Sequence, residues 1–338
     1  MKRSVITMSV LASLYAGQLL ASPHPAGPRA EAPLSDPYFS AAYTAQQEEP
    51  PVHPDVIEEN EPDELDVVRD IDEHGSDLEE ADYNLDMDIS PMSLQEAVDA
   101  PSRRPQNRGR DMHRSPRETL EFFGIEPSMT VVEVWPGGGW YTEILAPYLA
   151  AEGTFYAAHF PAEADSDYFR TALRNYHDML NTSNVYANVQ VTEFDPQSPQ
   201  DLAPEGSADM VLTFRNLHNW YMSDSEEGLD RAMQAFFDAL RPGGVLGVVD
   251  HRLPEDRDDE DANESGYIKQ SWVVAAAERA GFELEDESDI NANADDTADH
   301  EGGVWALPPT LRGGDEENSL VNIGESDRFT LKFRKPEE

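Results

Sequence analysis

Apolar runs alternate with amphipathic stretches from about residue 119 to the end of the chain. In residues 130–149 a β-branched run (TVVEVW) ends in Pro-Gly-Gly-Gly and leads into an apolar stretch at 140–150. This order predicts a buried strand, a glycine turn and a helix. Further strands are predicted at 153–160, 188–194, 208–214, 245–249, 282–285 and 328–333, and further helices at 119–123, 168–180, 229–240 and 272–280.

Strands that alternate with helices specify a parallel sheet covered by helices on both faces. Residues 208–214 (ADMVLTF) carry no charge beyond Asp209, as expected for a central parallel strand. Residues 328–333 (RFTLKF) alternate in polarity, which is typical of a half-buried edge strand. We therefore predict a doubly wound, mostly parallel, seven-stranded α/β sheet in one domain, residues 93–338.

The N-terminus has the layout of a secretory signal peptide. Lys2 and Arg3 precede a mostly apolar run, and Ala21 offers a small residue at a cleavage site before Ser22. We predict a cleaved signal peptide at 1–21 and a periplasmic or secreted protein, with no stable membrane insertion after cleavage. An uncleaved membrane anchor is the alternative. The chain has no cysteine, which excludes disulfides, thiolate chemistry and a lipoprotein anchor.

Residues 22–92 are predicted to form a disordered acidic arm. Between Glu48 and Asp88 there are eighteen acidic residues and one basic residue, Arg69. The segment is also rich in proline and poor in aromatic residues, so it buries too little apolar surface to offset its ordering entropy. A short helical stripe of Val67, Val68 and Ile71 is the alternative.

The whole chain is strongly acidic, with a net charge of −44 and a sequence pI near 4.2. Lysine occurs at four positions against twenty arginines. Such a carboxylate-rich surface repels phosphates, which argues against nucleic acid as a partner, and it suits the saline surroundings of a halophilic protein. The sequence does not define the oligomeric state.

The glycine turn at 136–139 carries the main functional signal. It places backbone N–H groups at the start of a helix, where doubly wound sheets bind nucleotide-like ligands. Here the sequence resembles the class I S-adenosylmethionine-dependent methyltransferases. It looks most like a family of exported bacterial proteins classed as methyltransferases, whose turn reads WPGGGWYTEILAPYL. The resemblance extends over nearly all of residues 110–335 and implies a Rossmann-like methyltransferase fold that ends in an antiparallel pair.

The resemblance implies S-adenosylmethionine as cofactor. Glu133 would face the methionine amino group and Asp195 the adenine, while Trp135 stands where the family has its first glycine. His159 follows the second strand in place of the usual ribose-binding acid, and Glu163 and Asp165 come slightly late. A plain strand–helix turn, with Asp195 as an ordinary turn residue, is the alternative. The predicted cofactor-binding residues are Glu133, Trp135, Pro136, Gly137, Gly138, Gly139, His159, Asp195 and Asn216.

The predicted catalytic residues follow the fourth and fifth strands. His218 is a candidate general base, and Asn219 and Arg215 are candidates for orienting a substrate or holding an anion. His251 follows the neighbouring strand, so the two histidines are expected to face each other across the crevice. Structural roles for these side chains are the alternative.

A lid and a metal site are two further candidate features. Residues 110–114 are basic in an acidic protein and are a candidate lid, with an exposed turn as the alternative. His113, His218 and His251 with Asp250 do not have the spacing of a metal motif, so no metal is predicted.

These observations predict a methyltransferase that acts on a small molecule or an exposed nucleophile. S-adenosylmethionine is made and kept in the cytoplasm, so an exported enzyme would lack its donor. The alternative is therefore an exported, non-catalytic binding protein that retains the fold and the crevice, which Trp135 and the absent ribose acid also favour. A hydrolase that uses the two histidines is a third reading, without a serine elbow or a cysteine to support it.

Overall fold

The computed structural model describes residues 90–198, 201–312 and 319–337. The predicted signal peptide, and the acidic arm as far as residue 89, lie outside the described residues. Among the described helices, none combines the length and apolar character needed to span a bilayer.

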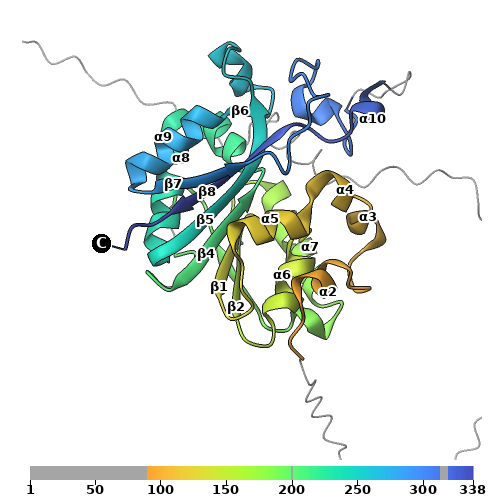
Figure 1. Cartoon of the computed structure of the whole chain (residues 1–338), viewed down its shortest axis with the longest axis vertical. Coiled ribbons are helices and arrows are strands. Elements are labelled where there is room, and N and C mark those ends of the chain that lie inside the picture. The colour runs from red at the N-terminus through yellow and green to blue at the C-terminus, as the bar shows by residue number, and fades with distance from the viewer. Residues whose placement is uncertain (1–89, 199–200, 313–318, 338) are drawn as a thin grey trace, which may run out of the picture. The chain divides into compact units, whose positions relative to one another are not determined.

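An eight-stranded sheet forms the centre of the domain (Figure 1). Its strand order is β3-β2-β1-β4-β5-β8-β7, with the short strand β6 paired to β5. Strands β1 to β5 pair in parallel, and β8 is antiparallel to both β5 and β7. The strands are β1 (Thr130–Val134), β2 (Thr154–His159), β3 (Val189–Glu193), β4 (Ala208–Phe214), β5 (Leu240–Leu253), β6 (Ile268–Lys269), β7 (Glu283–Ser288) and β8 (Arg328–Arg334).

The prediction of a doubly wound, mostly parallel sheet is confirmed, including the closing antiparallel pair. The two-residue strand β6 was not predicted, because it is too short to show a periodic pattern. Strand β5 extends beyond the predicted 245–249 at both ends, and its far end pairs with β6 through Arg252 and Leu253.

Two hydrophobic layers cover the sheet. One contains buried side chains of α8 and α9, and the other contains those of α2, α5 and α6. Figure 1 shows these two groups of helices on opposite sides of the strands. The helices are α2 (Leu94–Val98), α3 (Pro105–Arg108), α4 (Asp111–Arg114), α5 (Pro116–Phe123), α6 (Thr142–Leu149), α7 (Asp167–Leu180), α8 (Leu217–Ala239), α9 (Gln270–Ala280) and α10 (Ser319–Ile323). Short 3₁₀ turns lie at Asn184–Tyr186, Asp259–Asn263 and Gly303–Ala306.

Helix α8 begins earlier than the sequence predicted. Its first turns carry the polar and aromatic residues that follow β4, which lie outside the helix predicted at 229–240. The backbone leaves helical geometry at Asp224 and Ser225, so α8 is two helical pieces joined at a kink. His218, Asn219 and Trp220 are thereby held on a helix at the carboxyl end of the sheet.

Candidate functional site

A cavity of about 400 Å³ lies at the carboxyl ends of β1, β2 and β3. We call it the acidic pocket. Its aromatic walls are Trp135, Phe160, Phe169 and Trp220, and its charged residues are Glu163, Asp165, Glu193, Asp195, Asp224 and Arg231. This edge of a doubly wound sheet is where such folds bind their ligands.

Trp135 forms the inner wall of the acidic pocket. Its backbone has a positive φ of 49°, an uncommon conformation for a bulky residue. The indole Nε1 donates to the carbonyl oxygen of Phe194 at 2.9 Å, and the ring packs edge-on against Phe160 and Trp220, at centroid distances of 4.7 and 5.2 Å. The side chain thus fills the space that a glycine at this position would leave open.

Carboxylates outnumber cations around the acidic pocket. The one arginine among its described lining residues, Arg231, is ion-paired with Asp224 and donates to the carbonyl oxygen of Pro196 at 2.8 Å. Asp195 accepts from the backbone N–H of Gln197 at 2.8 Å, which is the hydrogen bond of an ordinary Asx turn, and it also lines the pocket. The pocket therefore has a surplus of negative charge, which favours a cationic ligand.

The other residues predicted to bind the cofactor do not line this pocket. Glu133 is buried and accepts from the hydroxyl of Thr142 at 2.7 Å, and that hydroxyl lies 3.0 Å from the Tyr176 hydroxyl. Burial raises the pKa of Glu133 to about 8, against opposing effects of Thr142 and Arg215. Glu133 is therefore mostly protonated at neutral pH. Pro136, Gly137, Gly138 and Gly139 are likewise absent from the lining.

His159 and Asn216 fix the backbone around the glycine turn. His159 Nε2 lies 3.1 Å from the carbonyl oxygen of Gly137, and its Nδ1 accepts from the backbone N–H of Phe160. Burial lowers the pKa of His159 to about 4, so the ring is neutral with its proton on Nε2. Asn216 donates to the carbonyl oxygen of Val134 at 2.9 Å and ties the end of β4 to β1.

A second cavity of about 40 Å³ lies beyond β4 and β5. We call it the arginine pocket. It shares no lining residue with the acidic pocket among the described residues. Its polar lining residues are Arg110, Arg114, Arg215, His251, Thr310, Glu325 and Ser326, with Trp305 among the apolar ones.

His218 and Asp250 form a fully buried pair next to the arginine pocket. His218 Nδ1 lies 2.8 Å from an Asp250 carboxylate oxygen, and Asp250 also accepts from the backbone N–H groups of Leu217 and His251, each at 2.7 Å. This contact fixes the orientation of the His218 imidazole ring.

The structure brings His218 and His251 together, with ring centroids 5.1 Å apart. His251 Nδ1 lies 2.5 Å from the hydroxyl of Ser326. Burial holds the pKa of His251 well below its ordinary value, and the nearby His218, Arg328 and Arg215 lower it further. Asn219 is fully buried, and its side-chain amide has no hydrogen-bond partner within the described ranges.

Ligand atoms of His218, Asp250 and His251 lie within 4.8 Å of one another, close enough to hold a metal ion. The sequence spacing did not indicate this constellation. However, the Asp250 oxygens already accept from His218 and from backbone amides, and His251 Nδ1 is engaged by Ser326. These contacts account for the cluster as a hydrogen-bonded network.

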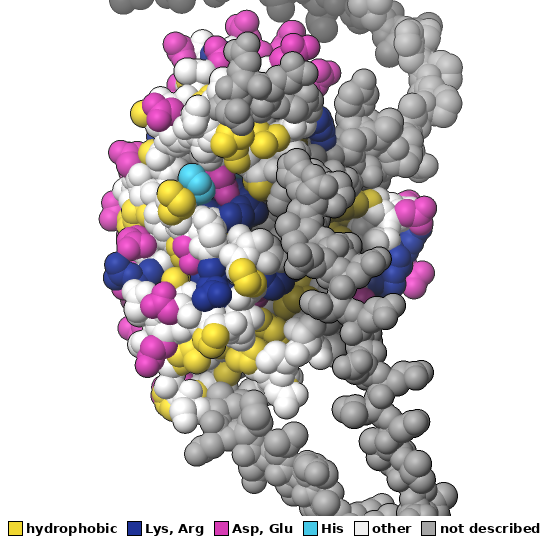
Figure 2. Space-filling view, turned by 90° about the vertical axis from the view of Figure 1, so that its right-hand side faces the viewer, with side chains coloured by type: hydrophobic (Ala, Val, Ile, Leu, Met, Phe, Trp, Pro, Cys, Tyr) yellow, Lys and Arg dark blue, Asp and Glu magenta, His cyan; other side chains and the backbone are white. Residues whose placement is uncertain are grey.

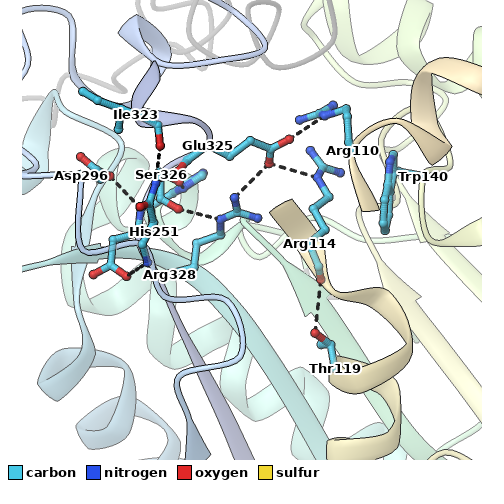
Figure 3. A network of polar contacts seen from close by, with 12 residues as sticks. Arg110, Arg114, Thr119, Trp140, His251, Asp296, Ile323, Glu325, Ser326 and Arg328 are labelled. Atoms are coloured by element: carbon cyan, nitrogen blue, oxygen red, sulfur yellow. Dashed lines mark hydrogen bonds and ion pairs between the residues drawn. The ribbon is translucent and has the colours of Figure 1, made fainter. Parts of the chain in front are cut away.

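Sequence reasoning missed Glu325, Ser326 and Arg328. Glu325 accepts from Arg110 at 2.7 Å and from Arg114 at 3.2 Å, across more than 200 positions of the sequence (Figure 3). No local sequence pattern predicts such a contact. The predicted lid segment around residues 110–114 is in fact the short helix α4, which this carboxylate holds at the arginine pocket.

Comparison with known proteins identifies no family: no family model matches the chain, and neither does any curated protein. Solved structures do match. An S-adenosylmethionine-dependent methyltransferase from Aquifex aeolicus is 15% identical, with 72% of this chain and 99% of that chain covered and a TM-score of 0.44. The arsenic(III) methyltransferase CrArsM from Chlamydomonas reinhardtii is 14% identical, with coverage of 73% and 74% and a TM-score of 0.40. The [4+2]-cyclase SpnF is 16% identical, with coverage of 66% and 81% and a TM-score of 0.45. The assignment of a Rossmann-like α/β fold rests on the strand order described above.

Proposed function

We propose that the protein is an S-adenosylmethionine-dependent methyltransferase that binds its donor in the acidic pocket. The observation that carries the proposal is the position of this cavity, at the carboxyl ends of the first three strands of a sheet ordered β3-β2-β1-β4-β5. The arginine pocket lies over the next strands and is the proposed acceptor side.

The lining of the acidic pocket fits the chemical groups of this donor. Its volume of about 400 Å³ lies in the range typical of small-molecule sites. Trp135 and Phe160 offer aromatic surface for a purine, and Asp195 and Glu163 offer acceptors for amino and hydroxyl groups. The surplus of carboxylates suits the positive charge of a sulfonium. When bound, the cofactor supplies an electrophilic methyl group.

The chain's own residues would prepare the acceptor. His218 is the proposed general base, and Asp250 fixes its ring through the contact at Nδ1. Three backbone N–H groups hold Asp250 in place. Both side chains are fully buried and line neither pocket, and His251, which lines the arginine pocket, lies next to this pair. His218 and Asp250 thus resemble the base and the orienting acid of a catalytic pair.

A second candidate is a non-catalytic binding protein that uses the acidic pocket alone. The specific observation in its favour is the separation of the two cavities, which share no lining residue in the described parts of the chain. The rings of Trp135 and Trp220, with centroids 5.2 Å apart, form part of the wall of the acidic pocket. Export to the periplasm or medium, which we also propose from the N-terminal sequence, favours this second candidate, because an exported enzyme would lack a donor that is made and kept in the cytoplasm.

Binding of S-adenosylhomocysteine to two variants tests the donor site. Asp195→Asn should weaken binding by roughly tenfold to a hundredfold, the effect of losing a charged hydrogen-bond acceptor. Asp238→Asn makes the same chemical change in an exposed residue in the last turn of α8, outside the pocket, and should bind like wild type. Equal affinities for Asp195→Asn and Asp238→Asn in calorimetric titrations would show that the ligand does not bind in the acidic pocket.

A further inference from the structure

Three arginines converge on one carboxylate beside the arginine pocket. Arg110, Arg114 and Arg328 all donate to the two oxygens of Glu325, at 2.7, 3.2 and 3.0 Å. Figure 3 shows the three guanidinium groups pointing at this carboxylate, two from α4 and its N-cap and one from the start of β8. Burial raises the pKa of Glu325, but the three arginines outweigh burial and hold it well below its ordinary value. Glu325 is therefore ionised, and it neutralises one of the positive charges.

A fourth arginine, Arg215, has no ion pair or side-chain hydrogen bond within the described ranges, although it lines the pocket. It is held at the end of β4 by a backbone hydrogen bond from its N–H to the carbonyl oxygen of Val249, at 2.7 Å, with a positive φ of 63°. Burial and the neighbouring Arg328 together lower the pKa of Arg215 to about 10. Arg215 is half-buried, so a partly exposed cation is held next to other cations.

This arrangement departs from the rest of the molecule. The chain carries a net charge of −44, yet three arginines and one glutamate line this cavity. In the space-filling view, Lys and Arg side chains lie across the middle of the visible face, and acidic side chains gather at its top (Figure 2). A partly buried cation without an ion pair is stabilised when an anion neutralises it.

We propose that the arginine pocket binds a small oxyanion, the carboxylate or phosphate group of a small molecule. Its volume of about 40 Å³ corresponds to roughly three water-sized spaces, which suits one such group. Guanidinium forks match both oxyanions with paired hydrogen bonds. Arg215 is the principal contact, with Arg110 and Arg114 on the opposite wall and Trp305 offering apolar surface beside it.

The bound anion would lie near the buried His218–Asp250 pair, because His251 lines the pocket and its ring centroid is 5.1 Å from that of His218. The site would thus select acidic ligands and hold them by their charged end. Binding of an oxyanion requires neither a methyl donor nor a transfer step, so a test of this site is independent of a test of the proposed function.

Titration of the full chain with sodium phosphate and with sodium malonate, at constant ionic strength set by sodium chloride, tests the proposal. We expect saturable binding of at least one probe, and the tighter of the two identifies the headgroup. Arg215→Gln should weaken it by tenfold or more. Arg117→Gln removes the same charge from an exposed position on α5 and should leave the affinity unchanged.

Two results would overturn the proposal: no saturable binding of either probe to the wild type, or equal losses in Arg215→Gln and Arg117→Gln, which would show a non-specific charge effect. Circular dichroism must first show that each variant is folded. If Arg215→Gln does not fold, Arg110→Gln replaces it, because the Arg110 side chain is partly exposed. That variant should also weaken binding, and wild-type affinity in it would contradict the proposal.

Discussion

The buried carboxyl of Glu133 should make the stability of the domain fall as the pH rises. The folded state keeps this group protonated up to a pKa of about 8, whereas the unfolded chain releases the proton near the ordinary value of 4.5. Between these two values the folded state binds the extra proton, so each rise in pH favours unfolding. The penalty is absent below pH 4.5 and is fully developed above pH 8.

Glu133→Gln removes the titration and keeps an oxygen that can accept from Thr142. A shift from 4.5 to about 8, at about 1.4 kcal/mol per pH unit, corresponds to about 5 kcal/mol. The variant should therefore resemble the wild type near pH 4.5 and gain stability over it by about 1.4 kcal/mol per pH unit, up to pH 8. Urea unfolding at fixed ionic strength, repeated at several pH values, measures this difference.

Glu152→Gln is the matched control, because Glu152 is exposed at the turn before β2. Its difference from the wild type should not change with pH. If the difference between Glu133→Gln and the wild type is also constant between pH 5 and pH 8, the carboxyl of Glu133 is not a buried, protonated group and the reasoning fails.

Three further predictions concern the stability of the fold. Gly303→Ala would place a Cβ 2.1 Å from the carbonyl oxygen of Ser265, whereas the Cβ of Gly302→Ala meets nothing within 4 Å at a similarly positive φ. In urea unfolding, Gly302→Ala should lower the free energy of unfolding by about 1–2 kcal/mol, and Gly303→Ala should lower it by roughly 1–3 kcal/mol more. Asp250→Asn puts an amide N–H₂ among groups that donate to the carboxylate, and should destabilise by about 3 kcal/mol in the same assay. Because the net charge is −44, sodium chloride should raise the melting temperature, and an unchanged or lower one at molar salt would contradict surface repulsion as a limit on stability.

The regular part of the fold was predictable from local patterns. Buried parallel strands such as β1 and β4 are mostly apolar, with one acidic residue in each, and α9 ends at Gly281, which has the positive φ typical of a helix end. The first turns of α8 were not predictable, because they carry polar and aromatic residues without an amphipathic stripe. Their position depends on tertiary contacts, such as the Asp250 carboxylate that accepts from the N–H of Leu217.

The candidate site was predictable only where it follows strand ends. His218 follows β4 and His251 lies near the end of the neighbouring β5, so their proximity was expected from topology and is observed. The contact between Arg114 and Glu325 spans 211 positions and comes from the packing of α4 against the segment before β8. The sequence also could not show that Trp135 lies against Phe160 and Trp220, because a side-chain direction depends on the backbone around it.

A crystal structure of the protein with S-adenosylhomocysteine tests the central claim most directly. The account predicts density for the ligand in the acidic pocket, with its purine against the aromatic wall that includes Trp135 and with a hydrogen bond to Asp195. An empty acidic pocket at a saturating ligand concentration, or a ligand bound elsewhere on the domain, would contradict the account.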